Sequence, residues 1–465
     1  MYQINFNQPC NIHFIGIGGI SMSGLAEILL QEGFHVSGSD SKESPLTSHL
    51  SAKGATIFYG QKKEHITETI DVVVYTAAVH PDNPEYEAAS EKNIPLLTRA
   101  ELLGQIMANY RISVGIAGTH GKTTTTSMVT QILLETDMDP TISVGGIMPA
   151  IGGNIRVGSS DVFVTEACEY TNSFLSFCPN MEVILNIEAD HLDFFKDIDD
   201  IRHSFRLYME KLNENGTLII NGDIKDVDVL TKDLPCHIIK VGTSCDENDY
   251  SADSIHFNEF ACATFSLIHR TQEHKKENLG TITLSVPGIH NVYNALAAIA
   301  LCLRMNIPME TICLGLSKFK GTNRRFEKKG EIGGVTIIDD YAHHPQEITA
   351  TLTAAKNYPH RKIWCVFQPH TYSRTKALMD DFAAALSLAD EVVLADIYAA
   401  RETDNLGISS NDLKEKIQNN GCHCHYFSTF DEIENFLLEN CINGDLLITM
   451  GAGDIVKVGE SVLGN

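Results

Sequence analysis

A strand, a glycine-containing loop and a helix are expected to follow one another near residue 120. The apolar run at 112–116 leads into Gly118-Thr119-His120-Gly121-Lys122-Thr123-Thr124. Glycines let backbone N–H groups turn inward around an anion, and the following helix adds the positive end of its dipole. Lys122 can then reach the outer phosphates of ATP, and the Thr123 hydroxyl can ligate Mg²⁺. The segment therefore predicts a phosphate-binding loop in an α/β domain.

This loop departs from the strict pattern G-x-x-x-x-G-K-[ST]. Ile116 occupies the position of the first glycine, and the nearby glycines are Gly115 and Gly118. The alternative interpretation is a glycine-containing turn without a ligand. The strand before the loop, the helix after it and the Gly-Lys-Thr between them favour phosphate binding.

The length of 465 residues allows about three domains of roughly 150 residues each. Short apolar strands alternate with helical spacing in the first hundred residues, in the middle of the chain and again in its last third. Such alternation predicts parallel sheets with right-handed crossovers. We expect an α/β fold with a Rossmann-like domain at 1–108, a central P-loop ATPase domain at 109–322 and a Rossmann-like domain at 323–465. Residues 246–278 predict antiparallel strands at a sheet edge, and residues 321–323 predict a hinge.

The net charge of −25 argues against a nucleic-acid partner, which would require a basic face. The sequence has neither the roughly 20 uncharged apolar residues that a membrane span needs nor an N-terminal signal pattern. A cytoplasmic protein is therefore expected. The twelve cysteines include no CxxC pair. Strand alternation over residues 422–425 would place the thiols on one face and the imidazoles on the other, which disfavours a metal cage there.

Acidic and imidazole side chains are expected where two strands of the central domain end. Glu166 ends one apolar strand, and Asp190-His191 follow the next. Each could be a locally bonded polar residue. Because open α/β sheets bind ligands at the carboxyl ends of their strands, a metal role beside the phosphate loop is favoured.

A second glycine-rich turn, Gly16-Ile17-Gly18-Gly19-Ile20-Ser21, follows the first strand, and Asp40 closes the second. The turn is similar to a dinucleotide fingerprint, with Ser21 at the third glycine position. It can bind any pyrophosphate, so a nucleotide-sugar fits as well as a nicotinamide cofactor.

Polar clusters also mark the expected strand ends of the last third. They are Arg324-Arg325, the run Asp339-Asp340-Tyr341-Ala342-His343-His344-Pro345, and the run Gln368-Pro369-His370-Thr371-Tyr372-Ser373-Arg374. Any one of them could be structural, His344 and Tyr372 in particular. Their recurrence at three successive units favours a common site.

Taken together, these motifs resemble the Mur ligase family over nearly the whole chain. The resemblance rests on both glycine-rich loops, on Asn186-Ile-Glu-Ala-Asp-His191, on Pro287-Gly-Ile-His-Asn-Val-Tyr-Asn294 and on the three C-terminal clusters. His120 and the Asp-Tyr-Ala-His-His-Pro run are typical of the alanine-adding branch. In place of the family's Glu-Ala-Asp-Glu-Ser-Asp, this chain has Glu166-Ala167-Cys168-Glu169-Tyr170-Thr171, which removes two acidic side chains.

The resemblance implies an ATP-dependent ligase that joins L-alanine to the lactyl carboxylate of UDP-N-acetylmuramate through an acyl phosphate, as a monomer or homodimer. It implies ATP binding by Gly118, Thr119, His120, Gly121, Lys122, Thr123, Thr124, Asn291, Asn294, Arg325 and Asp340. Two Mg²⁺ ions would be held by Thr123, Glu166 and His191. The UDP-sugar would lie on Gly16, Gly18, Gly19, Ile20, Ser21, Ser39 and Asp40. The acyl group and the amino acid would meet His120, Tyr341, His343 and Arg374, and the catalytic residues would be Lys122, His191, Arg325 and His343.

Three other functions fit parts of this pattern. A recycling ligase that attaches a whole peptide to the same sugar would share the loops, although its first glycine-rich turn differs. A nicotinamide-dependent dehydrogenase would explain the first turn and Asp40 but not the phosphate loop. A non-catalytic nucleotide switch would leave the strand-end polar groups outside the ATP site unexplained.

Overall fold

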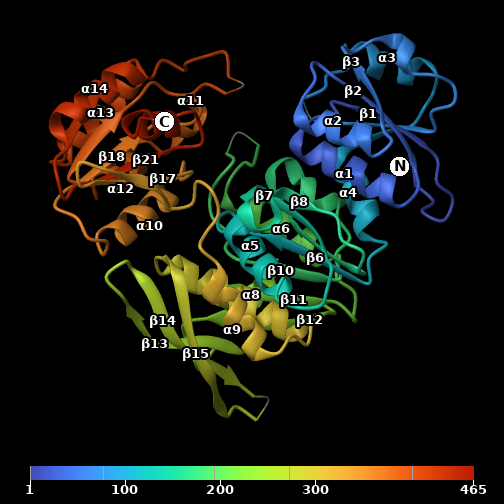
Figure 1. The fold of residues 1–465 in the computed structure, drawn as a ribbon. Helices are drawn as coiled ribbons and strands as arrows, with labels where there is room; N and C mark the ends of the chain where they lie inside the picture. Colours follow the sequence, from blue (N-terminus) through green and yellow to red (C-terminus); the bar gives the residue numbers. More distant parts are fainter. Residues whose placement is uncertain (1, 77, 193, 272, 401, 465) are drawn as a thin grey trace.

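The computed structural model describes residues 2–76, 78–192, 194–271, 273–400 and 402–464. Its strands form three separate sheets, built from strands within residues 11–98, 112–287 and 327–450. Figure 1 shows them as three lobes, with the N-terminal and C-terminal lobes on opposite sides above the central one. The α/β fold with three domains is therefore confirmed.

The N-terminal sheet is parallel throughout, with the strand order β3-β2-β1-β4-β5 that is typical of a Rossmann domain. Helix α1 starts directly after Gly19 and buries one side against the sheet. The elements are β1 Asn11–Ile15, α1 Ile20–Gln31, β2 His35–Asp40, α2 Pro45–Ala52, β3 Thr56–Tyr59, η1 Lys63–His65, β4 Val72–Tyr75, α3 Pro84–Glu91, β5 Leu96–Thr98 and α4 Arg99–Met107.

The central sheet has ten strands in the order β15-β14-β13-β12-β11-β10-β6-β9-β7-β8. Its strands are β6 Ile112–Ala117, β7 Thr141–Met148, β8 Gly153–Arg156, β9 Val162–Glu166, β10 Met181–Ile184, β11 Thr217–Asn221, β12 His237–Gly242, β13 Tyr250–Phe257, β14 Cys262–Arg270 and β15 Lys276–Pro287. Its helices are α5 Lys122–Leu133, η2 Pro149–Ile151, η3 Tyr170–Ser176, α6 Ile198–Met209, α7 Val227–Leu230, α8 His290–Arg304 and α9 Met309–Lys318.

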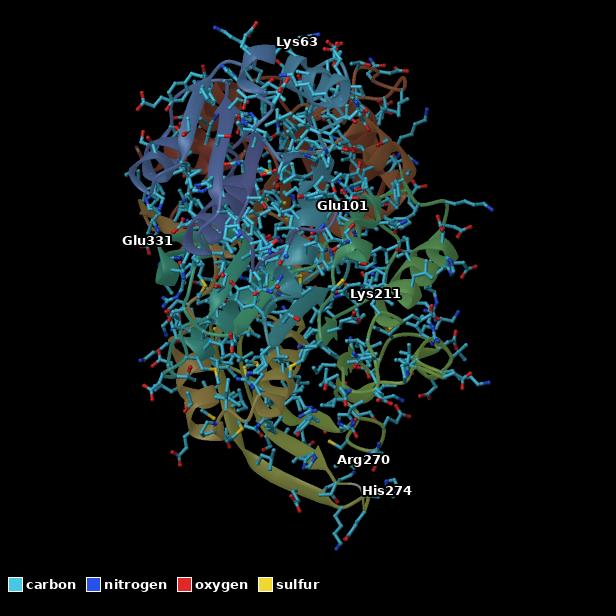
Figure 2. All side chains as sticks on the ribbon, turned by 90° about the vertical axis from the view of Figure 1, so that its right-hand side faces the viewer. Lys63, Glu101, Lys211, Arg270, His274 and Glu331 are labelled. Atoms are coloured by element: carbon cyan, nitrogen blue, oxygen red, sulfur yellow. The ribbon has the colours of Figure 1, made fainter. Side chains whose placement is uncertain are left out.

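Strand β6 lies in the middle of this sheet, between β10 and β9. The carboxyl ends of these three strands carry the phosphate loop, Glu166 and the segment that leads to His191, so they meet at one edge. The expected antiparallel edge is formed by β13, β14 and β15. Figure 2 shows Arg270 and His274 at the far end of the hairpin formed by β14 and β15, at the margin of the molecule.

The C-terminal sheet has the order β16-β17-β21-β18-β19-β20, with β16 antiparallel at one edge and the other strands parallel. Its elements are β16 Glu327–Ile332, β17 Val335–Asp340, α10 Pro345–Ala355, β18 Ile363–Phe367, α11 Tyr372–Ala377, α12 Met379–Leu386, β19 Glu391–Leu394, α13 Ser410–Asn419, β20 His423–Tyr426, α14 Phe430–Asn440, β21 Leu446–Met450 and α15 Val456–Val462. Helix α10 starts where β17 ends, which places its first turn at the carboxyl edge of the sheet.

Strand β20 has the alternation expected for the Cys-His repeat. Cys424 is buried in the core on one face, whereas His425 packs against Phe436 on the other. Among the described residues, no helix combines the length and the apolar character that crossing a membrane requires.

Candidate functional site

The phosphate loop connects β6 to α5 and depends on two glycines with positive φ. Gly118 has φ 147° and Gly121 has φ 84°. A Cβ atom on Gly121 would lie 2.5 Å from Asn294 Oδ1, and one on Gly118 would lie 2.9 Å from Leu185 Cβ. Glycine at both positions therefore lets the loop pack tightly against β10 and α8.

Lys122 is held inside this loop by a carboxylate. Its Nζ lies 2.9 Å and 3.1 Å from the two oxygens of Glu169 and donates to Gly118 O at 2.5 Å. Burial opposes the charge of Lys122, but the nearby Glu169 carboxylate raises its pKa above the usual value. Lys122 is therefore a fixed cation that an anionic phosphate can approach.

Thr123 and Glu166 form the hydroxyl–carboxylate pair expected for a magnesium site. Thr123 Oγ1 donates to Glu166 Oε2 at 3.1 Å, and the Gly145 backbone N–H donates to Glu166 Oε1 at 2.5 Å. Burial raises the pKa of Glu166. A buried carboxylate beside a hydroxyl supplies the hard oxygen ligands that suit Mg²⁺, so these residues fit the ion.

His191 lies at the same edge, with the left-handed φ of 52° that is uncommon outside glycine. Its Nε2 lies 3.9 Å from Glu169 Oε1 and 3.8 Å from Asp190 Oδ2. Its ring lies 4.5 Å from the ring of Tyr170. The imidazole lines the same small cavity as the phosphate loop, and backbone strain of this kind is often found at functional sites.

The C-terminal domain contacts the loop through Glu347, in the first turn of α10. Glu347 Oε1 lies 3.1 Å from Nδ1 of His120, and Glu188 Oε2 lies 3.4 Å from the other ring nitrogen of His120. Burial disfavours the charged imidazole, but these carboxylates, Glu347 above all, raise the pKa of His120 to about 10. His120 is therefore a second cation of the loop at neutral pH.

Arg325 reaches the site from the start of the C-terminal domain, and Asp340 reaches it from the end of β17. The Arg325 guanidinium lies over the Tyr341 ring at 5.3 Å and is 3.8 Å from Glu347. Asp340 accepts backbone hydrogen bonds from Phe326 and Ala342, and its burial raises its pKa to about 6.

His343 and Arg374 are two further residues that the C-terminal domain brings to the site. His343 Nδ1 is 3.0 Å from Tyr341 O, and burial lowers the pKa of this imidazole to about 4. Arg374 Nε donates to Asp190 Oδ1 at 3.3 Å, so the C-terminal domain is paired with the central one. Burial opposes the charge of Asp190, but Arg374 lowers its pKa below the usual range.

Three adjoining cavities connect these groups. A cavity of about 290 Å³ is lined by His120, Gly121, Thr123, Thr124, Asn291, Asn294, Arg325, Asp340 and Glu347, among other residues. A smaller one of about 130 Å³ is lined by Thr119, His120, Gly121, Lys122, Thr123, Asp190, His191, Arg325, His343 and Glu347. A third of about 380 Å³ is lined by Asp190, His191, His370, Arg374 and neighbouring residues. The small cavity shares five lining residues with the first and two with the third, so it lies between them.

The first glycine-rich turn lies in the N-terminal domain, and its residues line none of these three cavities. Gly16 has φ 82°, and the Gly18 N–H donates to Asp40 Oδ2 at 2.8 Å, so the turn and Asp40 are joined as their pairing in the sequence suggests. Ile20 is exposed. Ser21 accepts a hydrogen bond from Arg99 at 3.0 Å.

Ser39, which is expected near the nucleoside, forms a hydrogen bond inside the N-terminal domain. Its side chain is fully buried, and its hydroxyl donates to Glu85 at 2.5 Å. In this conformation the hydroxyl is therefore directed into the domain. No local pattern predicts this hydrogen bond, because Glu85 lies in α3, 46 residues away.

Sequence reasoning missed Glu347 and Glu188, although both line the first cavity. Pro345 at the first position of α10 signals a helix start, and Glu347 follows in the first turn. That signal could have directed attention to an acidic side chain at the carboxyl edge of β17.

The fold and the site define a nucleotide-dependent enzyme whose active site is assembled where two α/β domains meet. Family models match all three parts of the chain. They are the Mur ligase family catalytic domain at 11–111, the Mur ligase middle domain at 116–302 and the Mur ligase glutamate ligase domain at 324–453.

Individual relatives match over the full chain. UDP-N-acetylmuramate–L-alanine ligases of Lachnospira eligens and Agathobacter rectalis are 63% and 59% identical, each covering 100% of both chains. The crystal structure of the UDP-N-acetylmuramate-alanine ligase of Thermotoga maritima has a TM-score of 0.78 at 28% identity, covering 98% of each chain. The chain belongs to the Mur ligase family.

Proposed function

We propose that this protein joins L-alanine to the lactyl carboxylate of UDP-N-acetylmuramate at the expense of ATP, in peptidoglycan precursor synthesis. One observation carries this proposal: the cavity beside the phosphate loop adjoins the small cavity of about 130 Å³ (the small chamber), and that chamber adjoins the third cavity. A ligase of this kind needs such an arrangement, because the phosphoryl donor, the activated acyl group and the amine must meet in one protected place. The full-length relatives bear the name of this activity.

In the first step the lactyl carboxylate would attack the γ-phosphorus of ATP and form an acyl phosphate and ADP. Lys122 and Arg325 both line the small chamber, and their positive charges would offset the charge on the transferring group. In the second step the amine of L-alanine would attack the acyl carbon, and phosphate would leave. His343 lines the small chamber, and Arg374 lines the adjoining third cavity, from which the amine would arrive.

Two Mg²⁺ ions are part of this proposal, with Thr123 and Glu166 as ligands of one and His191 as a ligand of the other. The ions would neutralise phosphate charge. Asn291 and Asn294 would face the adenine, because they line the cavity beside the loop on the α8 side.

The N-terminal domain would hold the UDP group, with the pyrophosphate on the turn formed by Gly16, Gly18, Gly19, Ile20 and Ser21 and with Asp40 nearby. We place the domain boundaries at 1–108, 109–322 and 323–465. The proposed enzyme is cytoplasmic, works as a monomer or homodimer, and binds neither nucleic acid nor membrane.

Phosphate release measured with UDP-N-acetylmuramate, ATP and one acceptor at a time tests the proposal. We expect release that requires all three substrates, with L-alanine accepted and the tripeptide of a recycling ligase rejected.

Lys122→Ala should lower the rate of phosphate release at least about 100-fold, because one preorganised cation is lost from the transition state. The exposed Lys211→Ala is the matched control (Figure 2). Release without the sugar substrate, or an unchanged rate in Lys122→Ala, would contradict the assignment.

A further inference from the structure

Glu347 is the acidic side chain that joins the ATP side of the site to the acceptor side. Its side chain is only 13% exposed, and it lines both the cavity beside the phosphate loop and the small chamber. Each of its two oxygens faces a different set of partners. The sequence motifs and the proposed function leave this residue without a role.

One oxygen, Oε2, is directed at His343. It accepts the His343 backbone N–H at 3.0 Å and lies 3.3 Å from His343 Nδ1. The same Nδ1 lies 3.0 Å from the carbonyl oxygen of Tyr341. A carbonyl and a carboxylate can only accept, so Nδ1 must carry the hydrogen. In the neutral ring this leaves Nε2 with a free lone pair.

The other oxygen, Oε1, is held by cations of the ATP side. It lies 3.1 Å from His120 Nδ1 and 3.8 Å from Arg325 Nη1. Burial favours the neutral acid, but His343, His120 and Arg325 together hold the pKa of Glu347 well below its usual value. The carboxylate therefore stays ionised in a buried place.

The surroundings of His343 keep its ring neutral, so the lone pair on Nε2 is unprotonated before the amine attacks. Burial lowers its pKa, Arg374 acts in the same direction, and the carboxylates of Glu347 and Asp190 oppose them. His191, the other candidate, faces the Glu169 carboxylate that pairs with Lys122. Its place on the phosphate side suits it less well to receive a proton from the acceptor.

We propose that Glu347 is a positioning residue that orients His343 so that its Nε2 accepts the proton of the attacking amine. This inference rests on the proposed function. As the amine nitrogen bonds to the acyl carbon and the bond from that carbon to the phosphate oxygen breaks, one amine proton passes to His343 Nε2. Glu347 stabilises the imidazolium that forms, and the proton then leaves to solvent.

Formation of the acyl phosphate and its attack by the amine can be measured separately if the nucleophile is changed. Hydroxylamine is uncharged near neutral pH and attacks an acyl phosphate without help from a base, so hydroxamate formation reports on acyl phosphate supply alone. In Glu347→Gln we expect alanine ligation to fall about 100-fold while hydroxamate formation changes by less than about threefold. Glu347→Asp keeps the charge and should recover part of the lost alanine rate. Glu331→Gln, an exposed change at the edge of the same domain (Figure 2), is the matched control.

A double variant tests whether Glu347 acts through His343. If it does, Glu347→Gln added to His343→Ala should slow ligation no further than His343→Ala alone. The proposal would be overturned if the fold-losses of the two single variants multiplied in the double variant. It would also be overturned if Glu347→Gln lowered the rates with alanine and with hydroxylamine equally. Failure of the proposed function itself would look different, because the unchanged protein would then form neither product from ATP and UDP-N-acetylmuramate.

Discussion

His120 shows how one side chain of the phosphate loop can depend on both neighbouring domains. Its backbone N–H donates to Asn186 Oδ1 at 2.8 Å, which fixes the loop against the segment that follows β10. Its ring lies between Glu188 of the central domain and Glu347 of the C-terminal domain. An imidazolium in this place links two carboxylates that would otherwise repel each other.

The stability that His120 contributes should therefore depend on pH. The pKa is raised from 6.5 to about 10 in the folded protein, so the contribution is complete below about pH 6.5 and is lost as pH rises through about 10. We expect His120→Gln to lower stability by about 2 kcal/mol at pH 6, since hydrogen bonds to charged groups are lost. Scanning calorimetry from pH 6 to 10 checks this. A gap in Tm between the two proteins that stays constant over this range would contradict it.

The sequence predicts those loop residues that are marked by a local motif or by the end of an apolar strand. Lys122 and Thr123 follow Gly121 directly, and Glu166 ends a strand that pairs with β6. Glu347 lies 227 residues from His120. Their contact depends on how two domains are docked, and no periodicity or motif in a single sequence encodes that distance.

Helix α4 shows that the start of an element can be predicted from the sequence although its packing partner in another domain cannot. Its start is clear from the sequence, because Thr98 and Glu101 form a capping box. Its packing partner, η3, lies in the central domain and contains the segment that departs from the family pattern. Thr171 and Asn172 in η3 have φ values of 54° and 58°.

Gly104 in α4 is expected to be essential for this packing. A Cβ atom there would lie 1.9 Å from the backbone oxygen of Ser176. In an exposed helix, Gly→Ala stabilises by about 1 kcal/mol, but here the clash with backbone dominates, and we expect Gly104→Ala to destabilise by about 2 kcal/mol. Thermal unfolding measures the change. Gly153→Ala, where nothing lies within 4 Å of the added methyl, is the control. An equal Tm in the two variants would show that α4 and η3 can move apart.

Strands of continuous apolar residues were predictable, and the irregular ones were not. Strands β6, β9, β10 and β11 lie inside the sheet and have the short buried runs that the sequence shows. By contrast, β7 and β8 contain glycines and partly exposed positions, and their register shifts between Ser143 and Met148. Periodicity carries little information in such strands, because tertiary pairing rather than local pattern holds them.

At the scale of the whole molecule, the central and C-terminal domains are joined by polar contacts around the small chamber. Besides the pair of His120 and Glu347, His344 Nε2 lies 3.1 Å from the backbone oxygen of Ala189. Next to it, Arg374 pairs with Asp190, and both side chains are largely buried, at 11% and 7% exposure. These contacts hold the C-terminal domain over the phosphate loop, and in the proposed reaction such closure would exclude water from the acyl phosphate.

Removing the charge of Asp190 should therefore favour an open arrangement of the domains. Asp190→Asn leaves the buried Arg374 guanidinium without its counter-ion, and loss of one partner of a buried pair is costly, so we expect the closed form to be disfavoured by about 2 kcal/mol. Small-angle scattering should then give a larger radius of gyration for the variant without ligands, with the difference reduced when ATP and UDP-N-acetylmuramate are bound together.

The alanine ligation rate of Asp190→Asn should also fall about tenfold if closure precedes chemistry. Asp454→Asn removes an exposed pair with Lys457 in the C-terminal domain, to which Arg374 also belongs, and as the control it should change neither quantity. A variant with an unchanged radius and a reduced rate would show instead that Asp190 acts on the substrates and not on closure.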